Sequence, residues 1–160
     1  MASWQDLEQG APRIARPGRA RLDQARVVLL GTLRRDGSPR ISPVEPYFAR
    51  GQLMFGAMAW SGKARDLLRD PRCVMHSPIS APDAGEAELK VYGLVALADD
   101  PLRQACRDAW WLREPRAAAE VFVLDVTEAV LIEWDLKRGR MATMHWTPGR
   151  GLREQARRYP

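Results

Sequence analysis

Short runs of apolar residues, separated by turn residues, dominate the chain after its N-terminal segment. Residues 27–34 are apolar and partly β-branched, and the Asp-Gly pair that follows is a strong hairpin signal because glycine tolerates positive φ. Residues 38–48 predict a second strand, but their three prolines cannot donate ladder hydrogen bonds, so this strand is irregular or lies at an edge. After an Arg-Gly turn, residues 52–57 predict a third strand, and the three strands together predict a meander.

Strand patterns alternate with two helix signals along the rest of the chain. Ser61 is a good N-cap and Pro71 is a stop signal, so the segment between them predicts a short helix. An acidic cap at Asp99, followed by Pro101, predicts a second helix that ends near Glu114. Further strands are predicted over residues 72–77, 86–97, 121–134 and 139–146.

Six or seven strands with short turns and two inserted helices predict a mainly β (α+β) fold with a largely antiparallel, closed sheet. No strand is followed by a glycine-rich Rossmann turn, which excludes a doubly wound fold. A chain of 160 residues forms about one domain. We place this domain at residues 22–148, after an N-terminal surface arm at 1–21 with a short helix expected at 4–9, and before a basic, solvated tail at 149–160.

Composition narrows the choice of partners and compartment. Lysine and arginine total 25 against 20 acidic residues, a net charge of +5, yet the N-terminal arginines are not interleaved with aromatic residues, so no nucleic-acid partner is expected. The first thirty residues hold no long apolar run, and we expect neither a signal peptide nor contact with a membrane. Two cysteines at no motif spacing favour the reducing cytoplasm, and with two histidines they make a zinc cluster very improbable.

Lysine is scarce, and one of the three lysines occupies a special place. Lys63 follows Ser61 and Gly62 at the start of the first predicted helix. Helix N-termini carry unpaired N–H groups and partial positive charge, so this position suits an anion, with nearby Arg65 adding to the field. An ordinary capped helix with a solvated lysine explains the same spacing, and the residues alone leave both interpretations open.

Two segments resemble the pyridoxamine 5′-phosphate oxidase-like superfamily, the flavin- and deazaflavin-binding split β-barrels. They are the run LGTLRRDGSPR, which ends at Arg40, and the run SGKARDLLRDP, which begins at Ser61. The order of elements also matches, over residues 27–146, and the ending HWTPGRGL looks like a tail found in one bacterial branch. The resemblance implies an antiparallel split β-barrel of six to seven strands, of the FMN-binding type.

The same resemblance assigns expected site residues. Ser61, Gly62 and Lys63 would bind the cofactor phosphate, and Arg40 on the second strand would reach the same group. Thr32 would lie beside the ring system. The remaining expectations concern the stretch before the helix, where small side chains at Gly56, Ala57 and Ala59 would leave room for a flat ring and Trp60 would stack on that ring or only pack.

Two departures argue against activity on pyridoxamine phosphate itself. True oxidases of that substrate carry a second basic residue on strand two, where this chain has Glu45. Their closing motif of paired arginines and a histidine has no convincing counterpart here. No side chain stands out as an obligate catalytic acid or base, so catalytic residues remain unassigned.

The expected function is that of a homodimeric oxidoreductase with a cofactor site at the subunit interface, transferring a hydride between the cofactor and a small organic molecule. FMN is the first expectation, and a deazaflavin coenzyme (F-420 type) is the alternative, which would make the chain a deazaflavin-dependent reductase. Two non-enzymatic alternatives also remain, a flavin carrier or sensor and a haem-binding protein with His76 or His145 as iron ligand. For His76 a histidine packed at the barrel rim is the plainer explanation.

Overall fold

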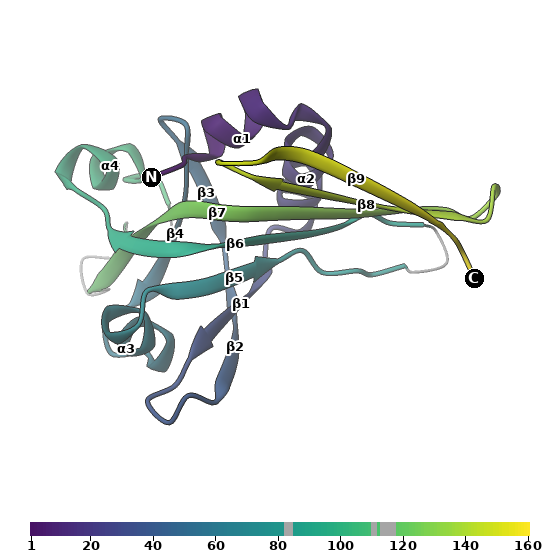
Figure 1. Cartoon of the computed structure of the whole chain (residues 1–160). Helices are drawn as coiled ribbons and strands as arrows, with labels where there is room; N and C mark the ends of the chain where they lie inside the picture. Colours follow the sequence, from purple (N-terminus) through teal and green to yellow (C-terminus); the bar gives the residue numbers. More distant parts are fainter. Residues whose placement is uncertain (82–84, 110–111, 113–117) are drawn as a thin grey trace.

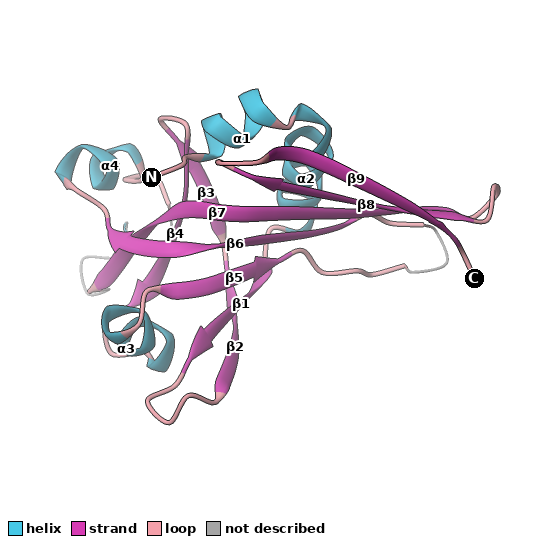
Figure 2. Cartoon of the chain, in the orientation of Figure 1, coloured by secondary structure: helices cyan, strands magenta, loops and turns pink. Residues whose placement is uncertain are grey.

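The computed structural model describes residues 1–81, 85–109, 112 and 118–160, and in them nine strands form one antiparallel sheet accompanied by four helices (Figures 1 and 2). The mainly β, antiparallel fold predicted from the sequence is therefore confirmed. The strands are β1 (Val28–Leu33), β2 (Pro39–Val44), β3 (Pro46–Ala49), β4 (Gln52–Met58), β5 (Arg72–His76), β6 (Glu88–Leu97), β7 (Ala119–Asp135), β8 (Arg140–Thr147) and β9 (Gly151–Arg158). The helices are α1 (Trp4–Gly10), α2 (Pro12–Ala25), α3 (Gly62–Arg69) and α4 (Asp100–Ala105).

Two differences explain why nine strands are present where six or seven were expected. The predicted second strand is divided at Glu45 into β2 and β3. Pro43 and Pro46 flank this break, and neither has an N–H group for a continuous ladder. The additional strand is β9, which pairs with β8 along its whole length within the segment expected to be a solvated tail.

The order of strands shows why the barrel is split. Seven strands follow one another as β2-β1-β5-β6-β7-β4-β3, while β8 and β9 extend from β7. The two ends of this path, β2 and β3, are consecutive in the sequence and separated only by Glu45. A chain spans at most about 3.6 Å per residue, so the sheet must curl until its edges nearly meet. Both hairpins of the expected three-stranded meander are present, as β1–β2 and β3–β4. The meander is not continuous, however, because the predicted middle strand is divided between the two ends of the path.

Buried and exposed side chains alternate along the strands, so one face of the sheet forms the core and the other is the outer face. In β1, Val28 and Leu30 are fully buried while Leu29 between them is exposed. The buried sides of β4, β6 and β7 contribute further to the same core, including the stacked rings of Phe55 and Phe122 at 5.6 Å between centroids. The core is continuous from the N-terminal helices to β8.

The N-terminal segment is part of the core, which corrects the expectation of a surface arm. The predicted short helix is confirmed as α1, but α2 follows it directly, and Trp4, Leu7, Ile14 and Leu22 are all buried. Figure 1 shows both helices (purple) beside the C-terminal strands, and the Cα of Gly10 lies so close to Trp146 that an added Cβ would be 2.6 Å from its ring nitrogen. The arginines, glycines and prolines of this segment obscure its apolar face in the sequence.

The second predicted helix begins where expected and is capped by Asp99, whose side chain accepts a hydrogen bond from the N–H of Leu102. α4 ends at Ala105, and residues 106–109 form turns, so the predicted continuation of this helix toward Glu114 is wrong up to residue 109. The rest of that continuation lies partly outside the described residues. Among the residues that the structure describes, no helix is both long enough and apolar enough to cross a membrane.

Candidate functional site

The start of α3 is built as the sequence predicts. β4 ends at Met58, and Ser61 takes an extended conformation before the first helical residue. Its hydroxyl oxygen accepts a hydrogen bond from the N–H of Ala64 at 3.3 Å, which is the bond of an N-cap. The prediction of Ser61 as the helix cap is therefore confirmed.

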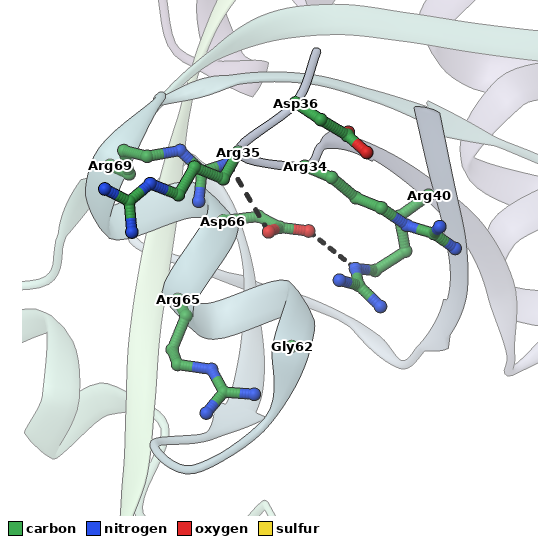
Figure 3. A pocket seen from close by; sticks show the side chains of 8 residues that line it. All are labelled: Arg34, Arg35, Asp36, Arg40, Gly62, Arg65, Asp66 and Arg69. Atoms are coloured by element: carbon green, nitrogen blue, oxygen red, sulfur yellow. Dashed lines mark hydrogen bonds and ion pairs between the residues drawn. The ribbon is translucent and has the colours of Figure 1, made fainter. Parts of the chain in front are cut away.

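A buried carboxylate, Asp66, ties α3 to the β1–β2 hairpin (Figure 3). Asp66 is only 4% exposed, and its Oδ2 accepts hydrogen bonds from Arg40 Nε at 2.6 Å and from Thr32 Oγ1 at 3.1 Å. Arg69 Nη2 lies 3.4 Å from its other oxygen and also donates to the carbonyl of Leu33. Thr32 and Arg40 face each other across the hairpin, so one carboxylate fixes the mutual positions of three elements.

The charge of Asp66 is stabilised by these donors. Burial on its own would raise the pKa of this carboxyl, but hydrogen bonds from Arg40 and Thr32 outweigh burial and hold the pKa below its ordinary value. The carboxylate in turn holds the Arg40 guanidinium in place beside α3.

Arginines surround a cavity above this carboxylate, which we call the arginine hollow. It has a volume of about 930 Å³, and five arginines against two aspartates give its lining a formal charge of +3. Figure 3 shows that these side chains come from the β1–β2 turn, from β2 and from α3, with the Arg40 and Arg69 guanidiniums directed at Asp66. The lining residues are Arg34, Arg35, Asp36, Arg40, Gly62, Arg65, Asp66 and Arg69.

Gly62 is the point at which the hollow meets the helix start. A Cβ at this position would lie 2.9 Å from both Cζ and Nη1 of Arg40, closer than carbon atoms approach in practice. Glycine therefore permits the Arg40 guanidinium to lie directly against the first turn of α3. The first turn of α3 thus brings the unpaired N–H groups and partial positive charge of a helix start next to a guanidinium. This combination suits an anionic oxygen.

A second cavity, which we call the seam hollow, lies where β2 and β4 face each other across the split of the barrel. Its volume is about 240 Å³, and its walls are mostly small or apolar. Lys63 reaches into it and donates from Nζ to the carbonyl of Pro43 at 3.1 Å, while burial lowers the pKa of this lysine. The lining residues are Val27, Pro43, Val44, Glu45, Gly56, Ala57, Met58 and Lys63.

The structure brings most of the predicted residues to these two hollows. Arg40 and Gly62 line the arginine hollow, while Lys63 and Ala57 line the seam hollow, and Ser61 caps the helix beside both. Thr32 donates a hydrogen bond to Asp66, but it is not among the described residues that line either hollow. Trp60 is 77% exposed, and it too is not among the described residues that line the two hollows.

Several residues of the arginine hollow were not predicted from the sequence. Asp66 gave no signal because it is one of several charged residues on a short helix and its partner Thr32 is distant in sequence. Arg69 follows Arg65 by one helical turn, a spacing that places both on one face of α3 and was available as a clue. Arg34 and Arg35 depend on the hairpin turn for their position.

Both histidines lie beside glutamates on the sheet. His76 Nε2 is 3.2 Å from Glu88, which also pairs with Lys90, and His145 Nδ1 is 3.1 Å from Glu128. In the described residues, no group of three or more histidine, cysteine or acidic side chains is arranged to hold a metal ion.

Comparison with known proteins gave matches among solved structures, whereas no family profile and no curated protein matched the chain. A pyridoxamine 5′-phosphate oxidase-related, FMN-binding protein from Nostoc punctiforme is similar over 98% of each chain, with a TM-score of 0.64 and 16% identity. PhzG from Burkholderia lata, in complex with tetrahydrophenazine-1-carboxylic acid, is similar over 92% of this chain and 89% of that chain, with a TM-score of 0.64 and 12% identity.

A haem-binding protein from Mycobacterium smegmatis is similar over 83% of this chain, with a TM-score of 0.63 and 23% identity. The match covers 58% of that protein, so this chain spans less than two thirds of its length. At these levels of identity, structural similarity establishes the fold alone. The split β-barrel fold that the resemblance implied is therefore confirmed. The chain shares its split β-barrel fold with the pyridoxamine 5′-phosphate oxidase-related, FMN-binding protein from Nostoc punctiforme.

Proposed function

We propose that the chain binds FMN at the start of α3 and acts as an oxidoreductase on a small organic molecule. The observation that carries this proposal is the meeting of two unlike hollows at Gly62 and Lys63, one strongly cationic and one lined by small and apolar residues. FMN has the same two-part chemistry, a phosphate dianion joined to a flat ring.

The residues present fit such a ligand. Lys63, Arg40 and the free N–H groups of α3 supply charge and hydrogen bonds for a phosphate. Gly56 and Ala57 leave the wall of the seam hollow flat enough for a ring. When bound, FMN would supply the hydride-transfer chemistry, and the chain would position it and exclude water.

The structural neighbours support this assignment without deciding the reaction. The Nostoc protein is FMN-binding and related to pyridoxamine 5′-phosphate oxidase, and a protein of the pyridoxinephosphate oxidase family from Clostridium acetobutylicum shares the fold. Hydride transfer to a small organic substrate is the reaction that this proposal includes.

The proposal also includes a homodimer. Register places Ile41, Gly31, Val74 and Tyr92 in one row across four adjacent strands on the outer face of the sheet. Ile41 is 71% exposed, and contiguous exposed apolar surface of this kind marks an interaction site. Leu29 on the same face pairs with Pro43 of the seam hollow, so a second copy seated on this row would also cover the mouth of that hollow.

Absorption and fluorescence titrations test which cofactor binds. The wild-type chain is expected to bind FMN saturably, with one FMN per chain. The Lys63→Ala variant is expected to bind FMN at least about tenfold more weakly, because a charged hydrogen-bond donor is lost. Lys137→Ala, on the distant turn between β7 and β8, is the matched control and should bind as the wild type does.

Parallel titrations with a deazaflavin coenzyme and with haem distinguish the alternative cofactors. A Soret band that depends on His76 or His145 would replace the flavin proposal with haem binding, and tight binding of the deazaflavin alone would replace FMN. Rapid reoxidation of the reduced, FMN-loaded chain by a small quinone or nitro compound supports an oxidoreductase. Bound flavin that exchanges electrons with none of these would leave a carrier.

A further inference from the structure

A separate cavity of about 290 Å³ lies on the C-terminal part of the sheet, and we call it the His145 hollow. It is formed by β7, β8, β9 and the turn between the last two strands, elements that contribute nothing to the arginine hollow or the seam hollow. Its lining consists of Glu128, His145, Thr147, Arg150, Gly151, Arg153 and Gln155.

Strand register explains why these side chains converge. His145 stands directly opposite Arg153 in the β8–β9 pair and opposite Val130 in the β7–β8 pair. Residues two apart on a strand share a face, so Glu128 lies on the same side of the sheet as His145 and Arg153. Gly151 has a φ of +66°, a conformation that glycine adopts readily, and it closes the tight turn that places Arg150 at the edge of the hollow.

His145 is oriented by a carboxylate. Its Nδ1 lies 3.1 Å from Glu128 Oε1, and a carboxylate only accepts hydrogen bonds, so Nδ1 donates. Nε2 is then left to a molecule in the hollow. The His145 and Glu128 side chains are 45% and 40% exposed, so a solute reaches them without any movement of the backbone.

The two arginines of the hollow are available to a ligand. Within the described part of the chain, no hydrogen bond or ion pair engages the guanidinium of Arg150 or Arg153. By contrast, Glu154 on the opposite face of β9 is paired with Arg13 of α2 at 2.6 Å. Two guanidiniums against one carboxylate leave the hollow with a positive charge, and the planar guanidinium fork matches the oxygens of carboxylate and phosphate groups.

We propose that the His145 hollow binds a small organic anion through a carboxylate or phosphate group held by Arg150 and Arg153, with His145 Nε2 contacting a neighbouring polar group of the same molecule. This site is independent of the FMN proposal, since it shares no lining residue with either hollow at α3.

Imidazole NMR of the full-length chain offers a direct test because His76 and His145 are the only histidines. The His76→Asn variant assigns the two signals. Inorganic phosphate and acetate are the probes, each replacing chloride at constant pH and ionic strength. Saturable movement of the His145 signal by either probe, with the His76 signal stationary, is expected, and the effective probe identifies the group recognised.

Matched variants separate this site from general charge effects. Arg153→Gln should weaken probe binding by about tenfold or more, because a charge-assisted hydrogen bond is removed. Arg157→Gln, on the same strand and face but outside the hollow, should change it less than twofold. Lys63→Ala should leave the His145 response intact. The proposal would be overturned if neither probe moves the His145 signal, or if both arginine variants weaken probe binding equally. Thermal melting checks that each variant is folded.

Discussion

At the residue scale, Asp66 is the group on which the geometry of the arginine hollow depends. We expect Asp66→Asn to lower the free energy of unfolding by about 2–4 kcal/mol, since it leaves Arg40 without its buried counter-charge. Urea denaturation measures this change. Asp36→Asn, in the same hollow but exposed, should change stability little, because the amide oxygen of asparagine can still accept the hydrogen bonds from Ser38. Equal effects of the two substitutions would contradict a structural role for Asp66.

The same residue makes stability depend on acid pH. The pKa of Asp66 in the folded chain lies below the value of about 3.8 for a free carboxyl, so its stabilisation is fully present above that value and is lost as pH falls through the folded pKa. Thermal melting followed from neutral pH to below about pH 3 should therefore show a smaller acid-induced drop in Tm for Asp66→Asn than for the wild type.

How far the site could be predicted differs from residue to residue. Ser61, Gly62 and Lys63 form a local pattern, and a helix start imposes its chemistry on neighbours in sequence. Asp66 and Thr32 meet only because α3 packs on β1, a tertiary contact that no local pattern encodes. The separation of Lys63 from Arg40 into two hollows likewise depends on where the barrel splits.

At the element scale, α1 and α2 belong to the folded unit. Ile14→Ala removes a fully buried side chain and should lower the free energy of unfolding by about 2–4 kcal/mol, whereas a solvated arm would give almost no change. Chemical denaturation provides the measurement. Arg16→Ala, two residues along the same helix and exposed, is the control and should be close to neutral.

The strands differ in how strongly their own residues predict them. In β1, β5 and β6, buried positions alternate with more exposed ones, and their largely apolar sequences located each strand to within about two residues. β9 carries mostly charged and polar side chains that remain exposed on both faces. Its strand conformation comes from the hydrogen-bond ladder with β8, so composition alone indicated a tail.

At the scale of the whole molecule, the exposed apolar row across β2, β1, β5 and β6 predicts the oligomeric state. Ile41→Glu should convert the proposed dimer into a monomer, and it costs the isolated chain little because Ile41 is largely exposed. Sedimentation velocity at several concentrations measures this. Arg72→Glu, which pairs with Leu94 nearer the other end of β5, tests whether charge alone is responsible, and a wild-type chain that sediments as a monomer would refute the dimer.

The link through Glu45 has a further consequence for how the molecule opens. The seam hollow is lined from one side by the end of β2 and from the other by β4, so a ligand there contacts two hairpins that the sheet itself does not hydrogen-bond to each other. Local unfolding of either hairpin would release the ligand. Ligand binding therefore raises the free energy of opening by the same amount for both hairpins. We therefore expect that filling the seam hollow couples the opening of the β1–β2 hairpin to that of the β3–β4 hairpin.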